Sequence, residues 1–282
     1  MAQSQYKLYK IQIDGDQDYI AGVSACLDLI ESVADGKKLL AAITTLSHQI
    51  FIQDTLDGNS CGAQSWSAFP PLPVAIKDKN TASFTTELKA AVDKAKSGGI
   101  TLEHLGRQLA MGLSPATYKS ASNVVPPTQK SPAPAGASAQ DIMFNAGLQA
   151  GTAMSILQEL MSGKRSVNNL PTDWDYELPR LLRPYLTPGT GAASKVSFNH
   201  TKTFHCADDP AMHKRPPAIG LAHELIHALH NSCGQNLALV KKDGENIEEL
   251  ITTGMPPYNF EELSDNKMRS QWPQHLQLRA NY

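Results

Sequence analysis

The chain has 282 residues, 41% of them hydrophobic and 18% charged, so it can bury a core as one large domain. Lys and Arg together number 25 and Asp and Glu number 27, which gives a formal net charge of −2. This balance excludes the strongly basic surface that is typical of nucleic-acid-binding and membrane-binding proteins, so we expect no nucleic-acid partner.

Cysteine spacing and the start of the chain limit the class of protein further. The four cysteines (Cys26, Cys61, Cys206 and Cys233) form no C-x-x-C pair, which argues against a zinc ribbon or a thioredoxin-type motif. The start, MAQSQYKLYKIQIDGD, lacks the apolar region of a secretory signal peptide, and no apolar run approaches the roughly 20 residues of a membrane span. The sequence therefore predicts no Sec-type export and no membrane span, and leaves export by another machine open.

In the first half of the chain, alternating β-prone runs predict strands and apolar residues at helical spacing predict helices. The expected strands are residues 6–13 and 48–55, and the expected helices are residues 19–33, 37–46, 85–97 and 102–111. Residues 56–80 are rich in Gly, Ser and Pro, which predicts a loop. Residues 114–139, rich in Pro, Ser and Ala, predict a flexible insertion within a single domain that spans residues 1–282.

The second half of the chain is predominantly helical in pattern. The expected helices are residues 141–162, 218–231 and 246–253, with a short strand at residues 195–199. Together with the first half, this predicts an α+β domain with a small sheet.

An H-E-x-x-H motif lies in the helix expected at residues 218–231, as His223-Glu224-Leu225-Ile226-His227. Residues four apart on a helix stand one above the other, so the two imidazoles lie about 6 Å apart and can share one Zn²⁺. Glu224 lies about 100° around the helix, where a carboxylate can reach a catalytic water without binding the metal. The motif therefore predicts a catalytic zinc site with Glu224 as its base.

A catalytic zinc site needs a third protein ligand, and the sequence offers several. Cys233 stands where metzincins carry their third histidine, but the required glycine at the seventh position after the first histidine is replaced by His230. His230 itself lies too far along the helix axis to join both other histidines. The remaining candidates are Glu248 and Glu249 on the next helix, as in gluzincins, and only one of two adjacent residues can face the metal.

Two motifs together resemble known families of metalloproteases. HELIH followed by EELITTG is similar to the paired zinc motifs of clostridial neurotoxin light chains. The overall layout more closely resembles the NleD-like effector metalloproteases of bacterial pathogens. Their characteristic segments have counterparts here in Ile13-Asp14-Gly15-Asp16 and in Asp265-Asn266-Lys267-Met268-Arg269. The resemblance implies a zincin-like fold, and the second glutamate of the pair, Glu249, as the third zinc ligand, with Glu248 orienting a histidine.

The resemblance also assigns a role to the end of the chain. Arg279 and Tyr282 form an R-x-x-Y pair, and the corresponding residues of the neurotoxin light chains stabilise the oxyanion of the tetrahedral intermediate. Chain termini often fray, so Arg269 and Tyr258 are the substitutes if the end is mobile.

Three weaker features surround the motif. The strand at residues 195–199 is either an ordinary core strand or the sheet edge to which an extended substrate adds. His200, His205, Cys206 and His213 cluster before the motif, but their spacing fits no standard metal site and indicates a loop. Lys214-Arg215 is expected to be a solvated turn.

The expected function is that of a zinc-dependent endopeptidase of the gluzincin type. The resemblance implies a bacterial toxin or effector that cleaves a host protein. We expect it to be a monomer that is made in the cytoplasm and exported by a specialised secretion system. Two alternatives remain open at this point. One is a zinc hydrolase of a non-protein amide bond, such as a cell-wall amidase. The other is a binding module whose metal is structural and closed by a fourth ligand, Cys233 or His230.

Overall fold

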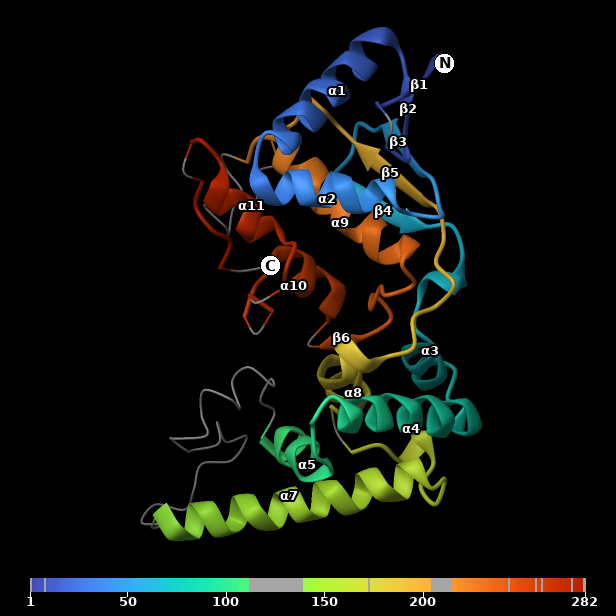
Figure 1. The fold of residues 1–282 in the computed structure, drawn as a ribbon, viewed down its shortest axis with the longest axis vertical. Coiled ribbons are helices and arrows are strands. Elements are labelled where there is room, and N and C mark those ends of the chain that lie inside the picture. The colour runs from blue at the N-terminus through green and yellow to red at the C-terminus, as the bar shows by residue number, and fades with distance from the viewer. Residues whose placement is uncertain are drawn as a thin grey trace. The chain divides into compact units, whose positions relative to one another are not determined.

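The contacts within the chain divide it into two compact units (Figure 1). Unit 1 comprises Met1–Phe69, Pro188–Ala238 and Glu245–Tyr282, and unit 2 comprises Pro70–Thr187 and Leu239–Gly244. The computed structural model describes residues 2–7, 9–111, 139–171, 173–203, 215–242, 244–256, 258–259, 261–274 and 276–280.

Unit 1 is built on a five-stranded mixed sheet with the strand order β1-β2-β3-β5-β4. The strands are β1 (Ala2–Gln5), β2 (Ile11–Gly15), β3 (Ile50–Asp54), β4 (Ser60–Ala63) and β5 (Ser194–Phe198). Strands β2, β3 and β5 run parallel, whereas β1 and β4 pair antiparallel at the two edges. The register places Ile13, Ile52 and Val196 in one row, and all three side chains are fully buried. Because alternate residues of a strand share a face, this row makes one face of the sheet apolar.

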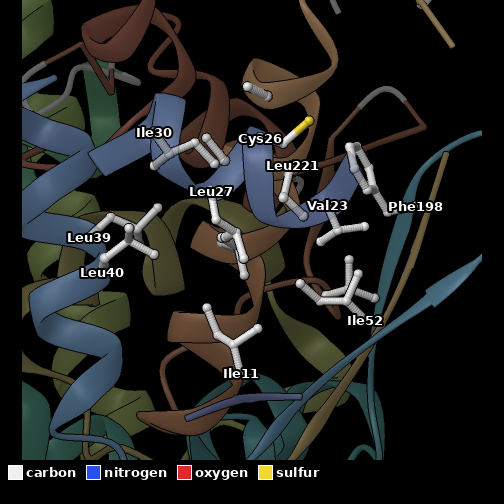
Figure 2. Packing of buried hydrophobic residues seen from close by; sticks show 14 of the residues in the cluster. Ile11, Val23, Cys26, Leu27, Ile30, Leu39, Leu40, Ile52, Phe198 and Leu221 are labelled. Carbon is white, nitrogen blue, oxygen red and sulfur yellow. The ribbon is translucent and has the colours of Figure 1, made fainter. Parts of the chain in front are cut away.

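The helices of unit 1 cover this sheet. They are α1 (Gln17–Glu31), α2 (Ala34–Thr44), α9 (Pro217–Ser232), α10 (Ile247–Thr253) and α11 (Asp265–Gln271), with the 3-10 turn η1 (Trp66–Ala68) and the short strand β7 (Glu245–Asn246). Helix α9 packs on β4 and β5, and α1 packs on β2 and on α9. Figure 2 shows Val23 and Leu27 of α1 within the same apolar cluster as Ile11 and Ile52 of the sheet and Leu221 of α9. Helix α9 therefore lies between the sheet and other helices, in the centre of the core.

Unit 2 is predominantly helical. It contains α3 (Pro71–Lys77), α4 (Thr81–Ser97), α5 (Leu102–Met111), α7 (Ala139–Met161) and α8 (Trp174–Leu182), with η2 (Val167–Asn169), η3 (Arg183–Tyr185) and the short strand β6 (Lys241–Lys242). Helix α5 packs along α7, and α4 contacts α3, α7 and α8. Phe84 and Leu88 of α4 and Leu157 and Leu160 of α7 are fully buried, so unit 2 has apolar packing of its own.

Most of unit 2 is inserted between two neighbouring strands of the unit 1 sheet. The chain leaves unit 1 after Phe69, just beyond β4, and re-enters it at Pro188, just before β5. The two ends of the insertion are adjacent, since the amide of Gly191 donates to the carbonyl of Ser67 at 3.0 Å. Among the described residues, the apolar cluster of unit 1 takes all its members from unit 1.

The α+β class with a small sheet is confirmed, but part of the predicted order is wrong. Residues 56–80 were expected to be a loop, yet they contain β4, η1 and α3; helices α8 and α11 were not predicted at all. Strand β4, with the sequence SCGA, has no β-branched residue, and it forms because it pairs with β5. The flexible insertion was expected at residues 114–139, and all of it except Ala139 lies outside the described residues. The single domain remains a prediction, since a division by contacts does not show that either unit folds alone.

The idea that the strand at residues 195–199 is a sheet edge is wrong. Strand β5 pairs with β3 on one side and with β4 on the other, so its backbone donors and acceptors are already used. The edge strand beside α9 is β4. In the described part of the chain, no helix is long and apolar enough to span a membrane.

Candidate metal centre

The HELIH motif lies in the middle of α9. This helix begins at Pro217, directly after Pro216, a favourable start because the first helical turn does not need the missing amide hydrogen. His223 and His227 are almost completely buried, and their rings meet edge to face with centroids 4.8 Å apart. The helix therefore holds the two imidazoles side by side, as their spacing predicts.

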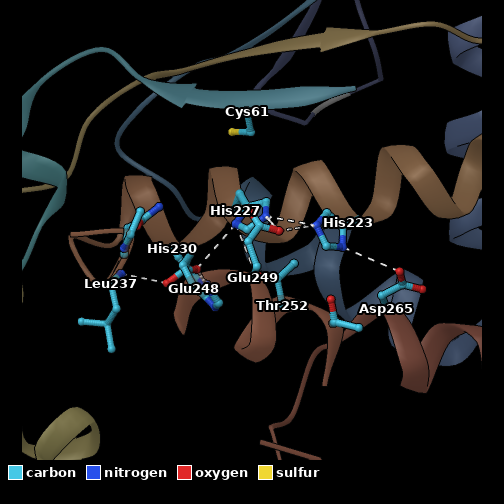
Figure 3. Close-up of polar contacts among 12 residues, drawn as sticks. Cys61, His223, His227, His230, Leu237, Glu248, Glu249, Thr252 and Asp265 are labelled. Carbon is cyan, nitrogen blue, oxygen red and sulfur yellow. Dashed lines mark hydrogen bonds and ion pairs between the residues drawn. The ribbon is translucent and has the colours of Figure 1, made fainter. Parts of the chain in front are cut away.

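Glu249 reaches these histidines from α10. Its Oε2 atom lies 3.1 Å from Nε2 of His223 and 3.2 Å from Nε2 of His227, and the two Nε2 atoms lie 3.1 Å apart (Figure 3). Helix α10 is short and ends at Gly254, whose φ of +77° is readily accessible only to glycine. The structure thus brings together three of the residues that the sequence singled out.

These three atoms fit one metal ion. A tetrahedral zinc site with bonds of about 2.0–2.1 Å separates its ligand atoms by about 3.3 Å, close to the distances observed here. Each residue offers one ligand atom, and among the described residues His223, His227 and Glu249 are the group that could hold a metal. Three protein ligands in this arrangement leave a fourth tetrahedral position open, as in catalytic sites.

Glu248 points away from the three ligand atoms and toward the outer side of the histidines. Its Oε1 atom lies 3.7 Å from Nδ1 of His227 and 2.5 Å from Nδ1 of His230, and its Oε2 atom accepts the backbone amide of Leu237 at 2.8 Å. The hydroxyl of Thr252 lies 3.3 Å from the same Nδ1 of His227. Adjacent glutamates on α10 therefore contact opposite sides of one imidazole.

The charges of these groups favour a cation at the centre. Burial alone would raise the pKa of Glu249, but hydrogen bonds from His223 and His227 hold that pKa well below its usual value. Burial lowers the pKa of His227, yet hydrogen bonds to Glu248 and Glu249 outweigh it and raise the pKa to about 10. Buried carboxylates need positive charge beside them, which either a protonated histidine or a bound divalent metal can supply.

Glu224 is buried beside the two histidines. Burial raises its pKa, while the positive charge of His223 and His227 acts in the opposite direction. A raised pKa makes a carboxyl a stronger proton acceptor than it is in water, which suits the role of a general base.

The end of the described chain packs against α11. The backbone of Arg279 makes two hydrogen bonds with the side chain of Asn266, of 2.7 and 3.0 Å. Its Nη1 atom lies 3.4 Å from the hydroxyl of Thr253 and 3.9 Å from Oδ2 of Asp265. Arg279 is thus held near the metal-binding residues rather than frayed, whereas Tyr282 lies outside the described residues.

One family of known proteins matches this chain. A family model described as an effector protein, Peptidase M91, matches residues 8–281. The chain belongs to the peptidase M91 family of effector proteins. No curated protein and no solved structure matches it. The residues that match the family model belong to both units. The match confirms the prediction that this M91 effector peptidase is an effector of the peptidase class.

Other candidates for site residues in this M91 effector peptidase lie elsewhere. Cys233 is exposed at the end of α9, and His230 turns to Glu248, so neither belongs to the group of three ligand atoms. The substitutes expected for Arg279 and Tyr282 are both buried: Arg269 is fully enclosed and bound to Asp265, and Tyr258 is 2% exposed. His200 is described, whereas residues 205, 206 and 213 lie outside the described residues.

The sequence analysis did not predict the burial of two charged residues of the M91 effector peptidase, Arg215 and Asp265. Arg215 was expected in a solvated turn, but it is 5% exposed, and a Cβ on Gly220 of α9 would lie 2.7 Å from its Nη2 atom. Asp265 was noted only as part of a motif, yet its Oδ2 atom lies 3.6 Å from Nδ1 of His223. The Asp-Asn-x-x-Arg segment was the available signal, but only the packing of α11 on α9 shows which histidine it faces.

Proposed function

We propose that this M91 effector peptidase is a zinc-dependent endopeptidase of the gluzincin type, with a zincin-like catalytic unit. His223, His227 and Glu249 would hold the zinc, and the observation that carries the proposal is the convergence of their three ligand atoms at 3.1–3.2 Å. Two imidazoles and one carboxylate form a donor set that suits Zn²⁺. The fourth position is left for water or substrate, which favours a catalytic over a structural metal.

The residues around the metal have distinct tasks in peptide hydrolysis. A zinc ion held by His223, His227 and Glu249 would supply Lewis acidity, which would polarise the scissile carbonyl and lower the pKa of a bound water. Glu224 takes the proton from the attacking water and gives it to the leaving amine, a transfer that its buried carboxyl suits. Arg279 supplies positive charge for the oxyanion, together with Tyr282 at the end of the chain.

An extended substrate would add to strand β4. Strands β4 and β5 are antiparallel, and the amide of Gln64, just after β4, donates to the carbonyl of Ala193. Because every second residue of such a strand bonds to its partner, the backbone groups of residues 62 and 60 also face β5. The backbone groups of Cys61 and Ala63 therefore face away from the sheet, on the strand that packs beside α9. Main-chain pairing of this kind supplies affinity that does not depend on the substrate's side chains.

The family assignment supports a protein substrate in a host cell. An effector acts outside the cell that makes it, and the NleD-like and neurotoxin-like motifs agree with cleavage of a host protein. We propose that export depends on a specialised secretion system and that the chain works as a monomer.

The test compares the wild-type chain with Glu224→Gln. This change removes the proton acceptor and leaves all three metal ligands, so zinc content should stay near one per chain while the rate falls by orders of magnitude. New protein N-termini in host cells that express either form, measured by mass spectrometry, identify the substrate. Equal sets of new termini would refute the mechanism, and cleavage of cell-wall fragments alone would replace the endopeptidase with an amidase.

A further inference from the structure

The two metal-binding histidines differ in what faces their outer nitrogen. Nδ1 of His227 has the hydroxyl of Thr252 at 3.3 Å and the carboxylate of Glu248 at 3.7 Å. Nδ1 of His223 is buried and has no hydrogen-bond partner, and the acidic group facing it is Asp265, whose Oδ2 atom lies 3.6 Å away. That Oδ2 atom is also buried without a hydrogen-bond partner. Two complementary polar atoms thus face each other, and leaving either one unpaired in a buried site is costly.

We propose that Asp265 is a positioning residue for the metal centre: it accepts a hydrogen bond from Nδ1–H of His223 and so presents the Nε2 lone pair to the metal. The inference rests on the metal centre of the proposed function. An imidazole that donates from one nitrogen to a carboxylate is a stronger and better oriented ligand through the other nitrogen. A shift of well under 1 Å would bring the observed 3.6 Å to hydrogen-bonding distance.

The surroundings of Asp265 keep its carboxylate charged and in place. It lies at the start of α11, and its other oxygen, Oδ1, accepts from Nε of Arg269 at 2.5 Å. Asp265 and Arg269 are both almost completely buried, so neither side chain can move aside into water. A charged carboxylate held on one oxygen by Arg269 leaves its other oxygen for His223.

The same oxygen also links the metal ligand to the end of the chain. Oδ2 of Asp265 lies 3.9 Å from Nη1 of Arg279, and the next residue, Asn266, holds the backbone of Arg279. Asp265 and Asn266 together thus connect His223 with Arg279. Loss of this carboxylate should disturb metal affinity through the histidine and turnover through the arginine.

The experiment measures the zinc affinity of the 282-residue chain by competition with a chelator, for the wild type, Asp265→Asn and Met268→Ala. Asp265→Asn keeps the shape of the side chain but makes it a weaker acceptor, and zinc affinity should fall about 10–100-fold. Met268 is a fully buried residue of the same helix. Met268→Ala should lower the melting temperature by creating a cavity but change zinc affinity less than about threefold, because it touches no polar contact of the centre.

A second measurement needs no variant. In the zinc-loaded wild type labelled with ¹⁵N-histidine, NMR should show the Nδ1 proton of His223 shifted downfield, as a proton that is hydrogen-bonded to a carboxylate is. An Nδ1 proton of His223 without this downfield shift would overturn the inference, as would wild-type zinc affinity in Asp265→Asn or an equal loss in Met268→Ala. These results leave the proposed function intact, whereas a wild-type chain that binds no zinc would refute the metal centre itself.

Discussion

Glu248 and Glu249 show how one residue step on a helix separates two tasks. Successive residues of an α-helix point about 100° apart, so the two carboxylates of α10 cannot both face the proposed metal position. Glu249 reaches Nε2 of both histidines, while Glu248 is enclosed on the far side, between Nδ1 of His227 and His230. Substituting the two residues should therefore have effects of different size.

We expect Glu249→Gln to lower zinc affinity by orders of magnitude, because it replaces a charged ligand with a neutral, poorer one. Glu248→Gln should cost about 10–100-fold, the usual effect of a group that orients a ligand. Cys233→Ser serves as the control and should bind zinc like the wild type, because Cys233 is exposed and outside the site. Zinc titration of the three variants measures this, and a large loss in Cys233→Ser alone would move the third ligand to Cys233.

The thiol of Cys26 makes the free energy of unfolding depend on pH in the alkaline range. It is a buried thiol on α1, and burial raises its pKa from 9.0 to about 11. The folded chain therefore holds the thiol proton more tightly than the unfolded chain does. This contribution to stability is fully present below about pH 9 and is lost as the pH rises toward about 11, by at most about 2.7 kcal/mol.

Denaturant unfolding between about pH 8 and about pH 10.5 measures this dependence, with Cys26→Ala as the reference. The variant is less stable at every pH because of the cavity, but its free energy of unfolding should fall less steeply across this range. Parallel curves for the two proteins would contradict a raised thiol pKa.

At the scale of elements, the position of β4 matters most for the proposed substrate. A strand at the edge of a sheet carries backbone groups that can pair with another chain. Residues 61 and 63 of β4 direct those groups away from β5, whereas Gly62 directs its own toward β5. Neighbouring positions on one short strand thus have opposite sensitivity to proline.

Ala63→Pro removes an amide hydrogen that faces away from the sheet, so zinc content and melting temperature should stay near wild type while kcat/KM on a protein substrate falls about 10-fold. Gly62→Pro is the matched comparison and should lower the melting temperature, since its amide belongs to the β4–β5 ladder. Unchanged kcat/KM in Ala63→Pro would show that the substrate does not pair with β4 at this residue.

At the scale of the whole molecule, the insertion of unit 2 between β4 and β5 leaves the residues of the proposed metal centre entirely within unit 1. His223, Glu224, His227 and Glu249 all belong to unit 1, as does the apolar cluster around α9. The two points where the insertion leaves and re-enters unit 1 are adjacent, since a Cβ on Gly189 would lie 2.5 Å from the carbonyl oxygen of Phe69. A short connection could therefore replace the insertion without moving either strand.

Replacing Pro70–Thr187 with a short Gly-Ser linker should yield a folded chain that binds zinc within about 10-fold of the wild-type affinity, because the core of unit 1 is retained. Circular dichroism measures folding, and zinc titration measures the affinity. The control is the same deletion combined with His223→Ala, which should no longer bind zinc tightly. An insoluble or unfolded product would show that unit 1 depends on unit 2 and would favour a single domain.

The sequence by itself determined the α+β class, most helices and the local geometry of the metal-binding motif. His223, Glu224 and His227 lie on one helix, and the 3.6-residue period specifies how their side chains point, whatever the rest of the chain does. The helices expected from apolar spacing in residues 19–33, 85–97 and 218–231 are present for the same local reason.

Only the tertiary structure decided the relations between elements. Strand β4 has no local strand signal and forms through pairing with β5, so the sheet edge could not be assigned from sequence. Glu249 and Asp265 come from two other helices, and which nitrogen of which histidine each one faces depends on how α10 and α11 pack on α9. Such contacts join residues far apart along the chain, where no local period constrains them.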